Sequence, residues 1–126
     1  CCERCYSFMK DRTILLTAAI DCIDKCIFYT KGMGIDEFLS DSKTQDAVVR
    51  NLEIIGQVVK DFGVDDLILD HPGFRWKEIS GMRNIIPREY LDVDLNVIWS
   101  ALTQNLIPLK VVLLEIKRDM NNAKRL

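Results

Sequence analysis

Several side chains in the stretch GMRNIIPREYLDVD could act on an anion or on RNA, namely those of Arg83, Asn84, Arg88, Glu89 and Tyr90. Two guanidinium groups close together can clamp a phosphate, since each can bind its oxygens bidentately. The tyrosine could stack on a base or offer its hydroxyl group. A solvated helix face also carries such charges, and it is the commoner interpretation of an arbitrary charged stretch. An Arg-Asn pair between Gly-Met and a nearby proline is, however, unusual for a simple surface helix.

The spacing of these residues would group them if the stretch is helical. Arg83 and Tyr90 are seven residues apart and would share a face. Asn84 and Arg88 are four apart and would form the neighbouring stripe. The chain holds a single histidine, His71, which we expect to be a solvated loop residue rather than a catalytic group. The sequence shows no nucleophile–histidine arrangement, phosphate loop or dinucleotide-binding turn.

Length and composition are those of one ordinary globular domain. A chain of 126 residues can bury a core without disulfides or metal, and 48% apolar with 29% charged residues is typical. No apolar run approaches the roughly 18 residues that a membrane span requires, so we expect no membrane association. The net charge of -2 gives no overall basic field, so RNA would need a local basic site, which a partner subunit could help to assemble.

The five cysteines favour a reducing compartment, and we expect a cytoplasmic protein. Cys2 and Cys5 have the spacing of metal ligands, but a zinc site needs two more ligands nearby, and His71 is far along the chain. We therefore expect neither a metal site nor a cofactor. Cys22 and Cys26 fall on the apolar face of a predicted helix and are expected to be buried.

Apolar residues recur with helical periodicity, and no alternating β pattern is present, so the sequence predicts an all-α, antiparallel up-and-down bundle. The predicted helices span 10–31, about 42–61 with Asp41 or Ser42 as cap, 76 to about 90, and the stretch from Asp94 onward, which Pro108 breaks or kinks. Residues 62–75 are expected to be a loop with at most a short helical turn. We divide the chain into an N-terminal tail (1–8), one helical domain (9–120) and a polar tail (121–126).

The second predicted helix has two stripes of different character. Its core stripe is Val48, Leu52, Ile55, Val59 and Phe62, and its polar stripe is Asp46, Arg50, Glu53, Gln57 and Lys60. Trp76 and Trp99 frame the charged stretch, and we expect both to belong to the core because of their size and helical spacing.

Two segments, KTQDAVVRNLEIIGQVVK and WKEISGMRNIIPREYLDVDLNVIW, resemble the HepT family of HEPN-domain proteins. The resemblance runs from about Met9 to Ile116. It implies a homodimer of helical bundles with the architecture of a metal-independent RNA endonuclease acting on tRNA or mRNA. Such proteins are the toxin halves of toxin–antitoxin modules whose antitoxin is a minimal nucleotidyltransferase, MNT.

The family motif is an Arg, a short spacer, a His, any residue and a Tyr. By this resemblance Arg83 matches the Arg, Asn84 the polar residue after it, and Tyr90 the Tyr to which the antitoxin transfers AMP. In the family, two copies of the motif meet across the dimer in a basic cleft.

The family match and the polar stripe together suggest further residues for this cleft. We place Arg50, Asn51 and Glu53 there beside Arg83, with a solvated helix face as an equally good interpretation.

The chain departs from the family at the histidine, because Arg88 stands at that position when Tyr90 is aligned. A guanidinium stays protonated, so it can bind phosphate but cannot serve as the base. We therefore expect strongly reduced nuclease activity. Three explanations remain open: a decayed toxin that only binds its antitoxin, an inactivating substitution selected because the toxin harms its host, or Glu89 as base in a shifted geometry. A rival function is a non-catalytic module that binds the nucleotidyltransferase.

Overall fold

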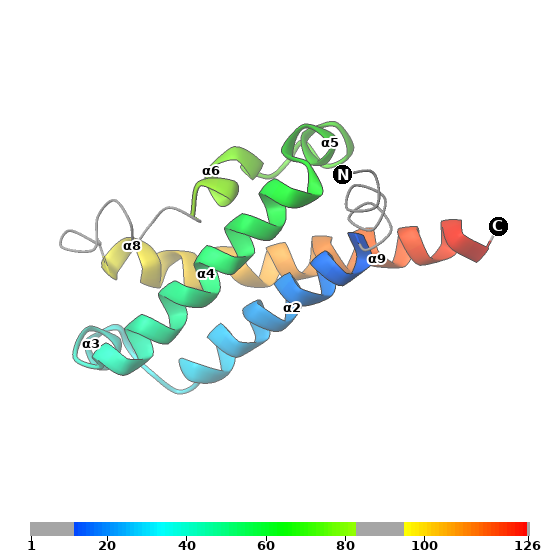
Figure 1. The fold of residues 1–126 in the computed structure, drawn as a ribbon. Helices are drawn as coiled ribbons and strands as arrows, with labels where there is room; N and C mark the ends of the chain where they lie inside the picture. The colour runs from blue at the N-terminus through cyan, green and yellow to red at the C-terminus, as the bar shows by residue number, and fades with distance from the viewer. Residues whose placement is uncertain (1–11, 83–94, 126) are drawn as a thin grey trace, which may run out of the picture.

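Helices make up the secondary structure of the computed structural model, which describes residues 12–82 and 95–125 (Figure 1). In chain order they are α2 (Arg12–Tyr29), α3 (Ile35–Leu39), α4 (Ser42–Phe62), α5 (Val64–Asp70), α6 (Trp76–Gly81), α8 (Leu95–Ser100), the π-helical turn η2 (Ala101–Asn105) and α9 (Leu106–Arg125). No strand occurs in the described ranges, and the expected all-α fold is confirmed.

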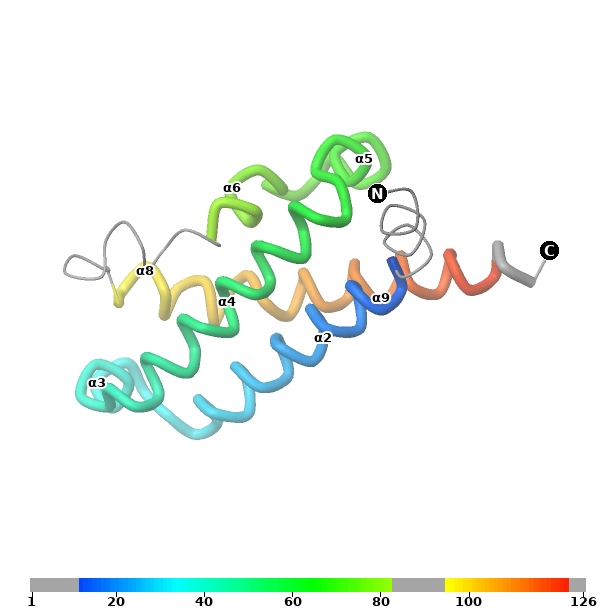
Figure 2. Tube along the Cα trace, in the orientation of Figure 1, coloured from blue at the N-terminus to red at the C-terminus, as the bar shows by residue number. Residues whose placement is uncertain are grey.

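The three long helices form the centre of the bundle. α2 packs against both α4 and α9, and it runs in the opposite direction to each of them (Figures 1 and 2). α6 packs on α4, and α5 lies at the end of α4 beside α6. The polypeptide thus follows the up-and-down path that the sequence predicts. α9 continues to Arg125, through the segment expected to be a polar tail.

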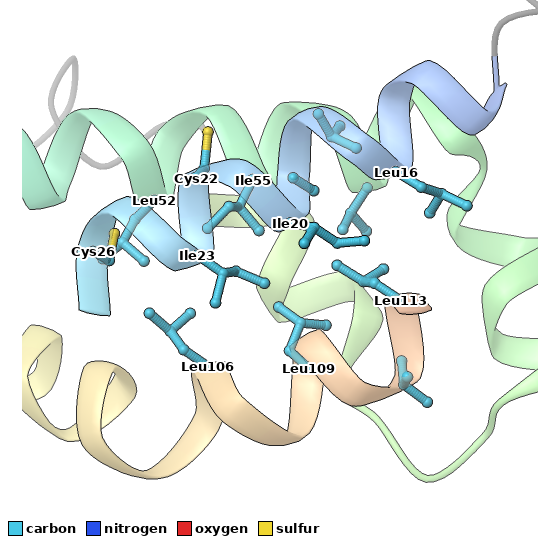
Figure 3. Packing of buried hydrophobic residues seen from close by; sticks show 14 of the residues in the cluster. Leu16, Ile20, Cys22, Ile23, Cys26, Leu52, Ile55, Leu106, Leu109 and Leu113 are labelled. Carbon is cyan, nitrogen blue, oxygen red and sulfur yellow. The ribbon is translucent and has the colours of Figure 1, made fainter. Parts of the chain in front are cut away.

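The core lies where these three helices meet (Figure 3). Its labelled members are Leu16, Ile20, Cys22, Ile23 and Cys26 from α2, Leu52 and Ile55 from α4, and Leu106, Leu109 and Leu113 from α9. Full burial of each such side chain stabilises the fold by about 1.5–3 kcal/mol. All five residues of the predicted α4 core stripe are buried, as expected.

Cys22 and Cys26 are buried in this core, as predicted, and neither forms a disulfide. Burial in an apolar environment disfavours the thiolate. It raises the pKa of the Cys22 thiol and raises that of Cys26 to about 12. Both thiols therefore act as small apolar groups rather than as nucleophiles.

Asp41, one of the two residues expected to cap the second long helix, does so. Its carboxylate accepts hydrogen bonds from the Thr44 backbone N–H (3.1 Å) and the Thr44 hydroxyl (2.7 Å). These bonds favour the charged form and lower the pKa of Asp41.

The expectation of a loop at residues 62–75 is wrong, because Val64–Asp70 forms the helix α5. Gly63, with φ +118°, ends α4 and begins α5 in a conformation that favours glycine. Leu67 is buried, and Val64 and Ile68 pack against the core beside it. This helical spacing of apolar residues outweighs the turn signals of Gly63 and Pro72.

Arg12 joins α2 to the α4–α5 corner. Its guanidinium lies 4.3 Å from the centre of the Phe62 ring, donates to the Phe62 carbonyl, and pairs with Asp66 at 3.1 Å. One side chain thereby fixes the start of α2 to two other helices.

The helix continues past Pro108, with the π-turn η2 placed immediately before α9. In this turn the Leu106 N–H donates to the Ala101 carbonyl, five residues back. A proline ring clashes with the carbonyl four residues before it, and a wider turn relieves that clash. The predicted irregularity is therefore a π-turn within a continuing helix.

The helical stretch Leu95–Asn122 is long and apolar enough to cross a membrane, by length and composition only. The expectation of no membrane association rests on uninterrupted apolar runs, which is a stricter criterion than mean composition, and it stays a prediction. The buried core helix of a folded domain passes the same test, and here Leu106, Leu109 and Leu113 pack into the core. This property is therefore only a weak indication of a membrane span.

Candidate functional site

Residues 83–94, which include Arg83, Asn84, Arg88 and Tyr90, lie outside the described residues. Their assignments remain predictions. The structure does describe the helices on either side of this segment. α6 and the following Met82 precede it, and α8 begins directly after it.

The helix before the segment is firmly anchored. Trp76 at the start of α6 is 1% exposed, and its indole N–H donates to the His71 carbonyl at 2.8 Å. Its ring also packs on Phe74, with centroids 5.3 Å apart. Trp76 is thus a core residue, as predicted, and it fixes the helix that leads to Arg83. His71 contributes its backbone carbonyl to this anchor.

The helix after the segment is anchored by two residues. Ile98 of α8 is buried, and Trp99 is half-buried with its ring 5.2 Å from that of Phe38. Trp99 therefore packs at the edge of the core rather than inside it.

A cavity of about 740 Å³ lies between α6 and the α8–η2–α9 helix. It is lined by Phe74, Arg75, Met82, Val97, Gln104 and Asn105, among others. Met82, which lines this cavity, is the last described residue before Arg83. Sequence reasoning did not find the cavity, because its walls come from residues about thirty positions apart and no local pattern joins them.

The three residues predicted for the cleft do not share one face of α4. Arg50 is exposed and Glu53 half-buried on the polar side of the helix. Asn51 is 8% exposed, and its side-chain amide donates to the Ala47 carbonyl at 2.7 Å. α4 packs on α6, so this helix does lie next to the one that leads into the motif. The role of all three residues in a cleft stays a prediction.

Comparison with known proteins gives a consistent family. The family described as ribonuclease HepT-like matches residues 19–116. The chain is 36% identical to the probable ribonuclease HepT of Thermococcus cleftensis, over 80% of this chain and 88% of that protein. No solved structure matches the chain.

Two proteins of Methanocaldococcus jannaschii are also similar. One, assigned as an RNase, is 36% identical over 71% of this chain and 74% of its own length. The other is assigned as both a gamma-glutamylcyclotransferase and an RNase, and it is 32% identical over 91% of this chain. The chain spans about half the length of that relative, 51%. With more than half of its residues matched by one family, the chain belongs to the HepT-like ribonucleases.

Proposed function

We propose that the chain is the toxin component of a HepT/MNT module with the architecture of a metal-independent RNA endonuclease. The observation that carries the proposal is the family match over residues 19–116, which encloses the Arg83-to-Tyr90 motif. The probable ribonuclease HepT, similar over most of both chains, supports RNA as the substrate class.

Cleavage of RNA without metal needs one group to remove the proton of the 2′-hydroxyl while its oxygen attacks the phosphorus. A second proton must reach the departing 5′-oxygen. Imidazole suits both steps because its pKa lies near neutrality. Arg83 would bind the phosphate in this arrangement. Arg88 at the histidine position can add to phosphate binding but cannot exchange the proton, so the chain would cleave RNA slowly.

A homodimer would supply the basic surface that one copy lacks. A dimer would hold two copies of Arg83 and two of Arg88. Their charges together would give RNA a local positive site, although each chain has a net charge of -2. α9 offers a surface for such contact, because Ile107, Val111 and Leu114 are 58%, 52% and 44% exposed on the side away from its core face. A helix with apolar residues on opposite sides commonly packs on both.

Transfer of AMP to Tyr90 by an MNT-type antitoxin would neutralise the toxin, since an added phosphate repels RNA from the cleft. The same step is central to the alternative function, a non-catalytic module that binds the nucleotidyltransferase. The absence of a histidine in the motif favours keeping this second candidate. We place the protein in the cytoplasm, without cofactor or metal.

Cleavage of total tRNA in EDTA tests the proposal. The chain should cleave slowly, and an Arg88→His variant should cleave about 10²–10⁴-fold faster, the usual contribution of a general acid–base group. An Arg83→Ala/Arg88→His variant is the matched control and should lose the gain. Absence of cleavage by all three proteins would reject the ribonuclease function and leave AMP transfer to Tyr90 as the activity to measure.

A further inference from the structure

The cavity between α6 and η2 contains polar groups available to a ligand. Gln104 and Asn105 are both exposed on η2 and line the cavity. Neither side-chain amide forms a hydrogen bond with another described residue. Each amide offers an acceptor and two donor hydrogens, the pattern that pairs with the edge of a base.

The opposite wall offers an aromatic surface and a charge. Phe74 is half-buried and held against Trp76 at 5.3 Å, so its position is fixed. The neighbouring Arg75 side chain is 83% exposed, and its contact with Glu78 is long, at 3.5 Å. Such an exposed ion pair is worth little, so a phosphate can replace the carboxylate as partner of Arg75.

The charge of its lining distinguishes this cavity from another one beside α5. A cavity of about 520 Å³ beside α5 is lined by Asp66, Asp70 and Asp119, and its Arg12 is already engaged with Phe62 and Asp66. Three carboxylates disfavour a phosphodiester there. The cavity at η2 has one exposed arginine and one glutamate, and its remaining lining is neutral. Of these two cavities, the one at η2 is therefore the more compatible with a phosphodiester.

We infer that the cavity at η2 is a nucleobase subsite. Gln104 and Asn105 hydrogen-bond to the edge of one unpaired base, Phe74 packs against it, and Arg75 contacts an adjoining phosphate. Unpaired bases are recognised in this way, by stacking together with hydrogen bonds to their edges. The inference rests on the proposed function for its substrate class, and it assigns base preference to residues outside the motif.

Binding of short oligoribonucleotides tests the subsite. The full chain is titrated in EDTA against labelled oligo(A), oligo(C), oligo(G) and oligo(U) of equal length, and fluorescence anisotropy is measured. The chain should prefer one base over the poorest by about tenfold or more. A Gln104→Ala/Asn105→Ala variant should lose this preference and bind the favoured oligonucleotide about tenfold more weakly.

Two further variants separate the subsite from general effects. Asn121→Ala/Asn122→Ala removes two exposed amides from α9 outside the cavity, and it should bind like the unaltered chain. Ala101→Leu puts a larger side chain into the cavity without removing a hydrogen-bonding group, and it should also lose the preference. Circular dichroism and thermal unfolding establish that each variant is folded.

The subsite is rejected if the Gln104→Ala/Asn105→Ala variant keeps the affinities and preference of the unaltered chain, or if that chain shows no preference. A changed elution volume of this variant, with unchanged RNA binding, would also reject it and identify the cavity as a protein contact. Cleavage by Arg88→His tests the proposed function separately. If Arg88→His cleaves RNA while the Gln104→Ala/Asn105→Ala variant keeps the base preference of the unaltered chain, the proposed function stands and only the subsite is rejected.

Discussion

The ammonium group of Lys110 on α9 lies 2.6 Å from a carboxylate oxygen of Asp24 on α2. The two residues are 86 positions apart, so the contact closes the bundle between its first and last described helices. Their side chains are 34% and 50% exposed, and water therefore weakens the attraction.

A double-mutant cycle of Lys110→Met and Asp24→Asn should give a coupling free energy of about 0.2–1 kcal/mol, the range for exposed pairs. It should decrease when the salt concentration rises, because salt screens exposed charges. Urea unfolding at low and high salt measures both. A coupling that does not change with salt would show that the pair acts through packing rather than charge.

Arg12→Ala should lower the free energy of unfolding by roughly 1–3 kcal/mol, because it removes the contact with the Phe62 ring, the bond to the Phe62 carbonyl and the pair with Asp66. Arg75→Ala is the control, since Arg75 is 83% exposed with one long contact, and its effect should stay within about 0.5 kcal/mol. Equal losses in urea unfolding would contradict the special position of Arg12.

Asp41 should make folding stability depend on pH. Its pKa in the folded chain is lowered, chiefly by the Thr44 hydroxyl and backbone N–H, so its contribution is fully present above the ordinary carboxyl value. That contribution is lost as the pH falls through the lowered, folded-state pKa. Asp41→Asn keeps a capping group that does not titrate.

Urea unfolding at several acidic pH values measures this effect. The difference in stability between the parent and Asp41→Asn should shrink as the pH falls. A difference that is constant with pH would reject the assignment.

The sequence predicts the long elements well because their apolar periodicity and their packing agree. The α4 core stripe and the Asp41 cap are examples, and each depends on residues close in sequence. α5 was not predicted because turn-forming residues surround it, and the core against which Leu67 packs comes from distant parts of the chain. Its ion pair with Arg12 likewise joins residues 54 positions apart. The π-turn before Pro108 was likewise not predictable, since the same proline could have ended the helix.

The candidate site likewise has one part that the sequence predicts and one part that it does not. The motif is visible in sequence because its residues are adjacent and resemble a family pattern. The cavity is not, because Arg75 and Gln104 line the same cavity only once the chain has folded. Asn51 was grouped with Arg50 and Glu53 because it is polar, but it is buried and its side-chain amide donates to the Ala47 carbonyl. The polarity of a residue alone therefore does not predict that it faces a cleft.

The most direct test of the central claim is the pH dependence of RNA cleavage by the Arg88→His variant beside the parent chain, under single-turnover conditions in EDTA. If residue 88 holds the acid–base position, the variant should cleave faster and its rate should change around pH 6–7, where imidazole titrates. The parent should stay slow without that change. A variant no faster than the parent, or a rate independent of pH in this range, would contradict the assignment of Arg88 to the catalytic position.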